Sequence, residues 1–555
     1  MALLPPRAKR TAAKSAPAAV PVRRTPHPRN PHDNPYRMDD PAEPLAVHEK
    51  WSLKVFAQLF IYFGFCVMLM TTIPNQIWDV ENRTFIYIMG VLGVWRYSWW
   101  FNHWMRAIIY ERVTFPKIRA RAQDFWDSGW RPKRIHVMMT TFREARSTAE
   151  AVVRSICSEV RDAGIPATIW IGSSEPEDER VLIEHFRTVG SDCDIELRII
   201  RQNQPGKRIA IALLLRAMSR EGLGSEDIVA FMDGDFVLDH GALNKCLPMF
   251  AADPELHALT TDEDVVVVGP QWLQSWLSMR FAQRRMAMMS HALSGRVLTL
   301  TGRFSVFRAT HIVSHDFIRL QEADFLNHWL WGTFRFLSGD DKSTWYALLQ
   351  HRVKMLYVPD SRGYTIEIIE GSAARRMIEN LRRWSGNMLR NGQRAIALGP
   401  TKMPFFIWWC CVDQRIAVWT MLFSPMLALA LTLKIGVSFL LAYLAYIGVT
   451  RGILSLVLFT YARRIDLNFI WTLYVNQVVN AAVKVYMLSR LSKQKWANRG
   501  NQKQGFSGNS ALQLYREWMA RYLTVFMVSA LFLAVMSYSK ALEMPNWRTV
   551  VAFLT

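Results

Sequence analysis

The sequence predicts a multi-pass membrane protein in which one α/β domain, a mostly parallel sheet with helices on both faces, is inserted between membrane-spanning helices. Of the 555 residues, 51% are hydrophobic, and the uncharged run 416–433 approaches the roughly 20 residues that cross a bilayer. Short apolar runs alternate with helical stretches between residues 132 and 370, which is typical of a parallel sheet. This composition excludes a disordered chain, a small disulfide scaffold and an ordinary cytosolic enzyme.

Lys and Arg number 67 against 46 Asp and Glu, a net charge of +21. Basic cytoplasmic loops explain such an excess in a membrane protein, so no nucleic-acid partner is predicted. The sequence contains six cysteines without a CxxC pair or a nearby His at ligand spacing. We therefore expect buried, reduced thiols and neither a disulfide framework nor a structural zinc site.

The N-terminal part is expected to be a tail followed by two membrane spans. Residues 1–50 are rich in Pro, Ala and Arg and lack apolar periodicity, so we predict a disordered, basic cytoplasmic tail. The first apolar run lacks a small-residue cleavage site, which argues against a secretory signal. Within 51–110, spans are expected at about Ser52–Ile73 and Thr84–Phe101. The basic stretch Arg112–Arg134 then favours a return to the cytoplasm.

Residues 111–372 form the predicted soluble domain. Strands are expected at four apolar runs: Ile135–Thr140, Ala167–Ile171, Ile195–Ile200 and Ile228–Met232. Helices are expected around 147–161, 178–188 and 207–220. This alternation predicts a mostly parallel sheet covered on both faces, and ligands on such sheets bind beyond the carboxyl ends of the strands.

The C-terminal part is expected to return to the membrane. Residues 373–402 are basic and amphipathic, so their helices should lie at the membrane surface. Region 403–540 should hold three more spans: Ile416–Leu433, Val437–Tyr461 and Tyr522–Tyr538. Arg451 lies inside the second of these, which is costly unless it faces a partner or a polar path. Residues 541–555 form a short tail outside.

The stretch 465–489 is polar on one helical face, where Asn476, Asn480 and Lys484 recur at every fourth residue. Both flanks are basic, so we predict an interfacial helix that does not cross the membrane. The total is then five crossings, or six if this helix does cross. Its polar face is the candidate lining of an export path, with hydrogen bonding between helices as the equal alternative.

Asp233 and Asp235 flank Gly234 at the end of an apolar strand, which places two carboxylates at the ligand edge of the sheet. The glycine lets the backbone approach a ligand closely. Carboxylate oxygens suit Mg²⁺ or Mn²⁺, and such a cation would neutralise a diphosphate leaving group. A simple Asp-Gly turn is the alternative.

Asp340 and Asp341 precede the helical run Thr344–Leu349. In the first turn of a helix the dipole keeps carboxylates ionised, and an ionised carboxylate can accept a proton from a hydroxyl group. The alternative is helix capping, with Ser338 or Asp340 as the N-cap.

Two further motifs carry aromatic and basic residues. Asn380, Arg383 and Trp384 lie on the amphipathic stretch, where Arg beside Trp is often a lipid anchor. The alternative is an Arg that pairs with a diphosphate and a Trp that stacks on a sugar ring. Trp496 and Arg499 lie in a gating-like polar loop, 490–510, that is either inert or a mobile flap over a phosphate-bearing site.

Taken together and in this order, these motifs resemble the processive family-2 glycosyltransferases, which include cellulose and hyaluronan synthases, and most of all the catalytic subunit of bacterial alginate synthase. The resemblance extends from about residue 52 to 538, and residues 280–284, 301–308 and 413–415 also carry it. It implies a GT-A fold and a metal-dependent, inverting transfer from a nucleotide sugar to a growing polysaccharide. It also implies a multi-pass protein of the bacterial inner membrane with a cytoplasmic catalytic domain.

The resemblance implies roles for the four acids. Asp233 and Asp235 match the Asp-x-Asp motif that binds nucleotide and metal. Asp341 matches the general base that deprotonates the acceptor, and Asp340 completes the acidic pair. The metal is expected to be Mg²⁺ or Mn²⁺.

Other residues also match the family in position. Arg383 and Trp384 match the end of the Gln-x-x-Arg-Trp motif, which holds the diphosphate and the acceptor sugar, although Asn380 replaces the Gln. Thr141 and Glu144 lie where the first strand meets the nucleotide, and Lys207 lies where a basic residue often contacts it.

Three further positions concern the nucleotide base and the loop. In the family an acid is usually found after the second strand. Here Ser173-Ser174 stands at that place, so the acid is missing, and Glu175 is the candidate to replace it. Residues 496–500 resemble the gating segment of these synthases.

The resemblance implies GDP-mannuronate as the donor and β-1,4-linked polymannuronate as the product. A uronate carboxylate needs cationic partners, for which Arg303, Arg308 and Lys342 are candidates. The same residues would serve a neutral sugar, so a cellulose- or curdlan-like β-glucan synthase that uses UDP-glucose is the alternative.

The expected partners are a nucleotide-sugar donor, the nascent polysaccharide and membrane lipids. No cyclic-dinucleotide-binding sequence is visible within the chain. The alginate synthases that it resembles rely on a separate membrane partner for this regulation, so the resemblance also implies a separate cyclic-di-GMP-binding membrane subunit. A non-catalytic scaffold or transporter subunit is the alternative from another class, and it would require degenerate acidic pairs.

Overall fold

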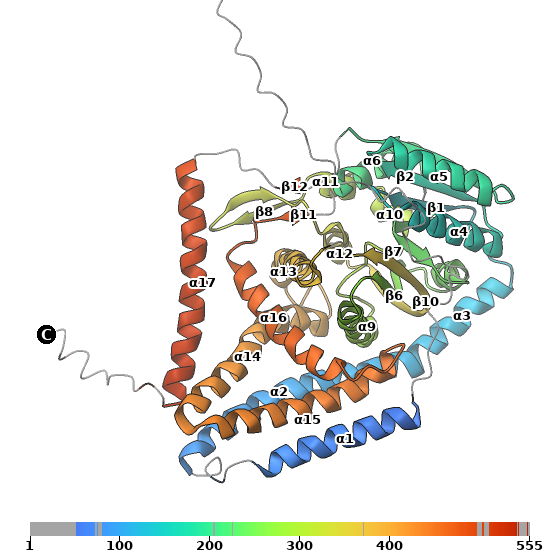
Figure 1. Ribbon diagram of the computed structural model, residues 1–555. Coiled ribbons are helices and arrows are strands. Elements are labelled where there is room, and N and C mark those ends of the chain that lie inside the picture. The colour runs from blue at the N-terminus through green and yellow to red at the C-terminus, as the bar shows by residue number, and fades with distance from the viewer. Residues whose placement is uncertain are drawn as a thin grey trace, which may run out of the picture.

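In this computed structural model, the described residues are 51–72, 75, 80–203, 206–224, 226–369, 371–496, 502–503, 510–540, 542 and 552. The predicted tail 1–50 lies outside them, as does most of 541–555. In Figure 1 the α/β unit lies on one side of the molecule and most of the long helices lie on the other.

An eight-stranded sheet forms the centre of the α/β unit. In spatial order its strands are β3 (Ile195–Arg201), β2 (Ala167–Ser173), β1 (Ile135–Thr140), β4 (Ile228–Asp233), β7 (Phe304–Arg308), β6 (Leu256–Val268), β10 (Lys354–Ile368) and β5 (Phe236–Leu238). The first four pair in parallel, as predicted, and β10 is parallel to β6. Strand β7 is antiparallel to both its neighbours, and β5 is antiparallel to β10. The sheet is therefore mixed, with parallel pairs in the majority.

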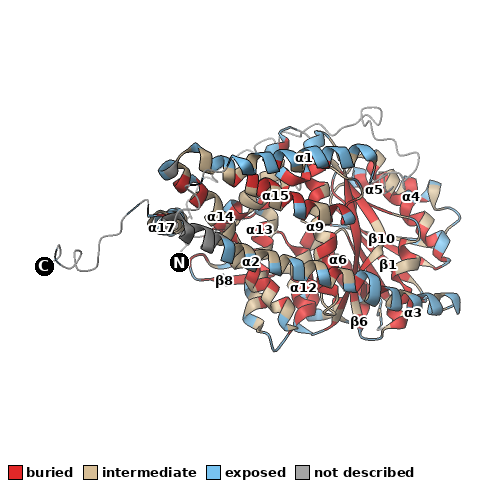
Figure 2. Ribbon diagram, turned by 90° about the horizontal axis from the view of Figure 1, so that it is seen from below, coloured by how far each residue is buried: buried red, intermediate tan, exposed pale blue. Residues whose placement is uncertain are grey.

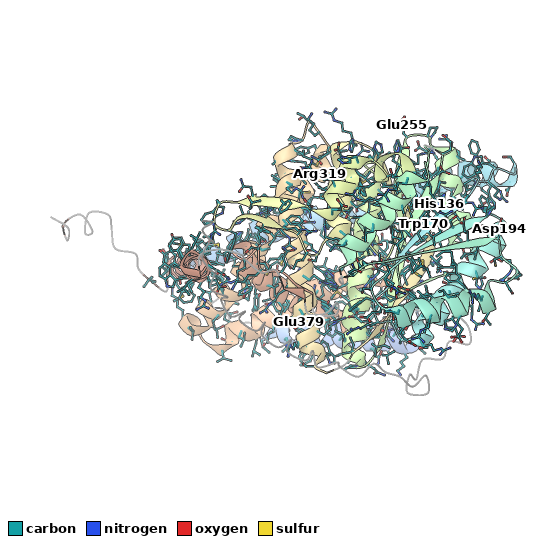
Figure 3. All side chains as sticks on the ribbon, turned by 90° about the horizontal axis from the view of Figure 1, so that it is seen from above. His136, Trp170, Asp194, Glu255, Arg319 and Glu379 are labelled. Carbon is teal, nitrogen blue, oxygen red and sulfur yellow. The ribbon has the colours of Figure 1, made fainter. Side chains whose placement is uncertain are left out.

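Helices cover the sheet on both faces. All residues of β1 and β2 are buried, which requires cover on each side. The first covering helices are α4 (Arg146–Ala163), α5 (Pro176–Val189) and α6 (Lys207–Arg220), close to the predicted ranges. Helix α9 (Gln271–Ala292) packs against β6 and β10. Between β2 and β1, Trp170 Nε1 donates to His136 Nδ1 at 3.2 Å (Figure 3).

Shorter elements complete the unit. They are α7 (Ala242–Cys246), α8 (Pro248–Ala252), α10 (Ala309–Ile312), α11 (His315–Glu322), α12 (Asp340–Gln350) and the hairpin β8 (Phe325–His328) with β9 (Gly332–Arg335). Outside the unit, the long helices are α1 (Leu53–Thr71), α2 (Val80–Ile109), α13 (Ala373–Leu398), α14 (Phe405–Ile435), α15 (Val437–Tyr461), α16 (Phe469–Leu488) and α17 (Ser510–Tyr538). A π-helical turn, Tyr110–Thr114, joins α2 to α3 (Phe115–Asp127).

The long helices pack on one another through polar contacts as well as apolar ones. Tyr62 of α1 donates to Gly448 O of α15 at 3.1 Å, and α1, α2 and α15 run side by side in Figure 1. Most of α1 is exposed, whereas α15 is half covered by its neighbours (Figure 2). Such apolar exposure is expected of helices that face lipid.

Four helices among the described residues are long and apolar enough to cross a membrane: Leu53–Thr71, Phe405–Lys434, Val437–Tyr461 and Ala511–Tyr538. They contain four of the five predicted spans. The predicted span Thr84–Phe101 lies in α2, which is not among the four because its Trp, Tyr and Arg96 side chains lower its hydropathy. Helix α16 is not among them either.

A buried charge network joins the sheet to the membrane helices. In the middle of β6, the carboxylates of Asp262 and Asp264 pair with Arg285 of α9, whose nitrogens lie 2.8 and 2.9 Å away. Arg463, just after α15, pairs with the same two acids at 3.0 and 2.7 Å. Since alternate residues of a strand share a face, both carboxylates point to α9 and α15.

Replacing Arg285 by Met should destabilise the protein strongly, because it leaves two buried carboxylates with only Arg463 as a counter-ion. The expected loss is about 3–5 kcal/mol of unfolding free energy. Arg154→Met, which removes an exposed pair with Glu150, should change the same quantity by less than about 1 kcal/mol. Thermal unfolding of the detergent-purified chain measures both. Equal melting temperatures for the two variants would contradict the role given to the network.

Candidate active site

Two carboxylates follow one another at the ligand edge of the sheet. Asp233 is the last residue of β4 and is level with Thr140, at the end of the parallel strand β1. Gly234 donates its backbone N–H to Thr140 O at 3.1 Å. A Cβ on Gly234 would lie 2.9 Å from that oxygen, so the turn requires glycine. The Asp-Gly-Asp motif thus lies where such a sheet binds ligands, with Asp235 just beyond the turn.

Lys207, the first residue of α6, connects the two acidic motifs. Its Nζ lies 2.7 Å from Asp233 Oδ1 and 2.9 Å from Asp340 Oδ2. Its side chain is only 8% exposed, so these ion pairs are little weakened by water. The predicted nucleotide contact therefore lies between the predicted metal-binding motif and the acidic pair.

Asp340 and Asp341 begin α12, as predicted, but the alternative, in which Ser338 or Asp340 is the N-cap, is wrong. The N-cap is Gly339, with φ +90° and no side-chain capping bond. Ser338 Oγ instead donates to Asn387 Oδ1 at 2.9 Å. A Cβ on Gly339 would lie 2.9 Å from the Asn387 side chain, because the turn packs directly against α13.

The two acids of this pair differ in proton affinity. Burial alone would raise the pKa of Asp340, but the ion pair with Lys207 and the charge of Arg208 hold it below its ordinary value. Burial and the adjacent charge of Asp340 raise the pKa of Asp341. Asp341 is thus the more basic of the two carboxylates.

A cavity of about 350 Å³ opens at this edge of the sheet. We call it the catalytic cavity. It brings together these predicted site residues: Lys207, Asp233, Arg303, Asp340, Asp341, Lys342, Arg383 and Trp384. Among the described residues, Glu175 and Arg308 do not line it, and neither do four further predicted residues: Thr141, Glu144, Asp235 and Asn380.

These four lie close behind the lining. Thr141 follows β1 and donates its N–H to Gly172 O at 3.1 Å, and Glu144 lies in the loop before α4. The charge of Asp235 acts on Arg303. Asn380 Oδ1 accepts a hydrogen bond from Arg383 Nη2 at 3.3 Å.

The predicted substitute acid and the gating loop lie farther out. Glu175 pairs with Arg143 at 2.8 Å at the end of β2. Trp496 belongs to β11 (Lys495–Trp496), which pairs with β12 (Gln502–Lys503). The side chain of Trp496 and all of Arg499 lie outside the described residues.

Trp384 is held on an aromatic and cationic support. Its ring stacks on Trp276 of α9, with centroids 6.1 Å apart and an interplanar angle of 21°. The guanidinium of Arg280 lies 4.7 Å from the centroid of Trp384. Asn476 Oδ1 of α16 accepts from Trp276 Nε1 at 2.9 Å and from Arg280 Nη1 at 3.2 Å. Trp384 of α13 thus packs against α9, and α16 in turn holds the two side chains of α9 that contact it.

The prediction that Arg308 contacts a uronate is wrong. Strand β7 is antiparallel to β4, so Arg308 pairs in register with Ile228 at the opposite edge of the sheet. There it donates to the carbonyl oxygens of Leu256 and Phe250, at 2.9 and 2.5 Å. Arg303 precedes the same strand and therefore lies at the ligand edge.

A second cavity, of about 370 Å³, lies among the long helices. We call it the membrane cavity. Its polar lining includes Tyr97, Gln283, Asp413, Arg451 and Gln477. Arg451 donates to Tyr97 Oη and to Gln477 Oε1, both at 2.9 Å. The expected partners of this intramembrane Arg are therefore present.

The predicted polar face of α16 is turned inward. Asn476 bonds to α9, and Asn480 Oδ1 accepts from Ser385 of α13 at 3.4 Å. Hydrogen bonding between helices is thus confirmed for two of its residues, while the adjacent Gln477 lines the membrane cavity.

The cysteines are free, as predicted, and among the described residues all but Cys193 are buried. One of them joins a cluster that sequence spacing did not indicate. Ligand atoms of His103, His291 and Cys410, from α2, α9 and α14, lie within 4.8 Å of one another.

Comparison with known proteins decides the family. Residues 132–387 match the family described as "Glycosyltransferase like family 2". A protein named Glycosyltransferase alg8 from Pseudomonas syringae pv. tomato is 35% identical over 88% of this chain and 98% of its own length. Its namesake from Azotobacter vinelandii is 32% identical over 86% and 97%. The chain belongs to the alg8 family of family-2 glycosyltransferases.

The predicted resemblance and the GT-A fold class are thereby confirmed for this alg8-family protein. Among solved structures it is similar to a mannosyltransferase from Pyrobaculum calidifontis in complex with GDP-Man and Mn²⁺. The two share 16% identity over 69% of this chain and 98% of that one, with a TM-score of 0.40.

Three lining residues of this alg8-family site were given no role from sequence: Glu263, Arg280 and Arg284. Glu263 pairs with Arg284 and with Arg303. The sequence does contain patterns that could have pointed to these three residues. Arg280 and Arg284 have the i, i+4 spacing of one helix face, and Glu263 belongs to a run of three acids before an apolar strand end.

The raised pKa of Asp341 predicts an acid limb in the pH profile. The predicted base must be ionised to act, so kcat/KM should fall on acidification at a pH above the ordinary Asp value of about 3.9. In Asp340→Asn the adjacent charge is removed, the pKa of Asp341 falls, and the limb in the residual activity should move to lower pH. Asp316→Asn, at an exposed site on α11, should leave it in place. An upward shift in Asp340→Asn would contradict this assignment.

Proposed function

We propose that this chain polymerises β-1,4-linked mannuronate from GDP-mannuronate, with inversion at the transferred sugar, at the cytoplasmic face of the bacterial inner membrane. The observation that carries the proposal is the convergence of Asp233, Asp341 and Trp384 on one cavity. These are the groups that a nucleotide-sugar donor, an acceptor hydroxyl and an acceptor ring require.

The donor end of the cavity offers an oxygen donor set for a divalent cation. Asp233 and Asp235 supply carboxylates, and Glu263 Oε2 is buried without a hydrogen-bond partner among the described residues. Such oxygens fit Mg²⁺ or Mn²⁺, which when bound would neutralise charge on the diphosphate. Lys207 and Arg383 would hold the diphosphate oxygens. Thr141 and Glu144 stay proposed for the nucleotide.

Asp341 would act as the general base. Its carboxylate lines the cavity, and its raised pKa gives it affinity for the proton of an acceptor hydroxyl. The oxygen of that hydroxyl attacks the anomeric carbon as the bond to the diphosphate breaks. Asp340 stays paired with Lys207 and keeps this Lys beside the leaving group.

Trp384 would position the acceptor sugar. Its ring packs against Trp276 and Arg280, and a sugar ring can stack on an aromatic face. Asn380 would act through its hydrogen bond to Arg383. The loop around β11 and β12, with Trp496 and Arg499, stays proposed as the gate.

The membrane cavity would receive the product. Helix α9 forms part of the wall of both cavities, because Gln283 lines the membrane cavity and Arg284 lines the catalytic cavity. We propose that α2 crosses the membrane with α1, because Arg96 is neutralised by Asp413 of α14 at 2.7 Å. Both ends of the α/β unit then lie on the cytoplasmic side. Lipids and a cyclic-di-GMP-binding membrane subunit are the proposed partners.

Asp341→Asn should abolish sugar transfer without loss of GDP binding. General-base catalysis contributes about 10²–10⁴-fold, so incorporation of labelled sugar into polymer should fall by that factor. Asp316→Asn is the matched control of the same chemistry on the surface. Full incorporation by Asp341→Asn would remove the base assignment.

A donor panel tests the substrate. Membranes containing the chain are given labelled GDP-mannuronate, UDP-glucose or UDP-N-acetylglucosamine, with and without Mg²⁺ or Mn²⁺. Polymer should form only from GDP-mannuronate and only with a divalent cation. Polymer from UDP-glucose would favour the β-glucan synthase instead.

A further inference from the structure

The two ends of the catalytic cavity differ in charge balance. At the donor end, Lys207 pairs with Asp233 and Asp340, and Arg303 pairs with Glu263. Positive charge at this end is therefore balanced by carboxylates of the protein itself.

At the other end, beside Trp384, Arg280 has no such partner. Its guanidinium lies against Trp384 and Trp276, at 4.7 and 5.2 Å from their ring centroids. Its hydrogen bond goes to the uncharged Oδ1 of Asn476. Within the described part of the chain, Arg280 makes no ion pair with any carboxylate. Burial lowers its pKa to about 10, as expected where no acid compensates for desolvation.

Lys484 of α16 adds a second cation at this end. The charges of Arg280 and Asp413 both act on it. Asp413 lines the membrane cavity and is already paired with Arg96. The Lys484 side chain makes no hydrogen bond or ion pair with any residue that the structure describes. Lys484 is therefore a cation without a paired carboxylate among the described residues, on the same face of α16 as Asn476 and Asn480, whose side chains bond to α9 and α13.

Two enclosed cations without counter-ions are costly to the protein alone, and they suit a ligand that brings negative charge. The residues proposed to hold the donor diphosphate are Lys207 and Arg383. An anion beside Trp384 belongs instead to the acceptor. Sugar acids carry a carboxylate on every unit, and a guanidinium binds a carboxylate through two parallel hydrogen bonds.

We propose that Arg280 and Lys484 form a carboxylate subsite for the growing end of an anionic polysaccharide. Arg280 binds the carboxylate of the sugar that stacks on Trp384. Lys484 binds a carboxylate of the following part of the chain, as it passes towards the membrane cavity. This inference rests on the proposed polymannuronate product and assigns its acceptor-binding residues.

Binding of two matched ligands tests the subsite. The probes are β-1,4-linked trimannuronate and its carboxyl-reduced trisaccharide, titrated calorimetrically into the detergent-purified full chain. Arg280→Gln and Lys484→Gln should each weaken trimannuronate binding by about 10- to 100-fold, as expected for one charge-assisted hydrogen bond. Binding of the reduced trisaccharide should stay within about twofold. Lys484→Arg, which keeps the charge, should restore most of the affinity.

Arg382→Gln is the matched control, because Arg382 is an exposed cation on α13 that lies against Tyr486. It should leave both affinities unchanged. Equal weakening of both trisaccharides, or unchanged trimannuronate binding in the variants, would overturn the subsite. So would a wild-type chain that binds the two trisaccharides equally well or binds neither.

The donor panel separates this failure from that of the proposed function. A wild-type chain that incorporates mannuronate while Arg280→Gln and Lys484→Gln bind trimannuronate normally refutes the subsite alone. A wild-type chain that incorporates only glucose refutes the proposed donor.

Discussion

The acids of β6 are the interaction on which the rest of the structure depends. Asp262 and Asp264 bind Arg285 and Arg463, and Glu263 between them faces the catalytic cavity. Because alternate residues of a strand point to opposite faces, this one strand fixes the membrane helices with two side chains and the active site with the third. A shift of α15 or α9 against the sheet would therefore expose buried charge, and the catalytic groups are kept in register with the membrane region.

Neighbouring charges also make the two acids of the catalytic cavity, Asp340 and Asp341, differ in proton affinity. Lys207 lies between two acids and keeps Asp340 ionised, whereas Asp341 is left with raised proton affinity. Two adjacent carboxylates thus acquire different roles from their environment alone, since only one of them has a cationic partner at contact distance. The same principle leaves Arg280, on the wall of this cavity, without a paired carboxylate among the described residues.

Local pattern predicted the local features well. The strand that ends at Asp233 and the helix that begins at Asp340 follow from apolar runs and an acidic first turn. The predictions that failed depend on the direction in which a strand runs and on contacts between parts of the chain that are far apart in sequence. Arg308 was misplaced because sequence does not show that β7 runs antiparallel, and the cluster of His103 with Cys410 joins helices far apart in the chain. The capping alternative failed because a tight turn against α13 requires glycine at the N-cap, Gly339.

The geometry of α9 would make the proposed link between synthesis and export a short one. Arg280 lines the catalytic cavity, whereas Gln283, one helical turn further on, lines the membrane cavity. A helix with its side chains is about 10–12 Å across, so a single element separates the two spaces. Trp276, on the same helix, packs against Trp384, the ring that we propose binds the acceptor sugar, and it donates a hydrogen bond to Asn476 of α16. Movement of α9 or α16 would therefore act on the acceptor platform and the membrane cavity together, without any intervening domain.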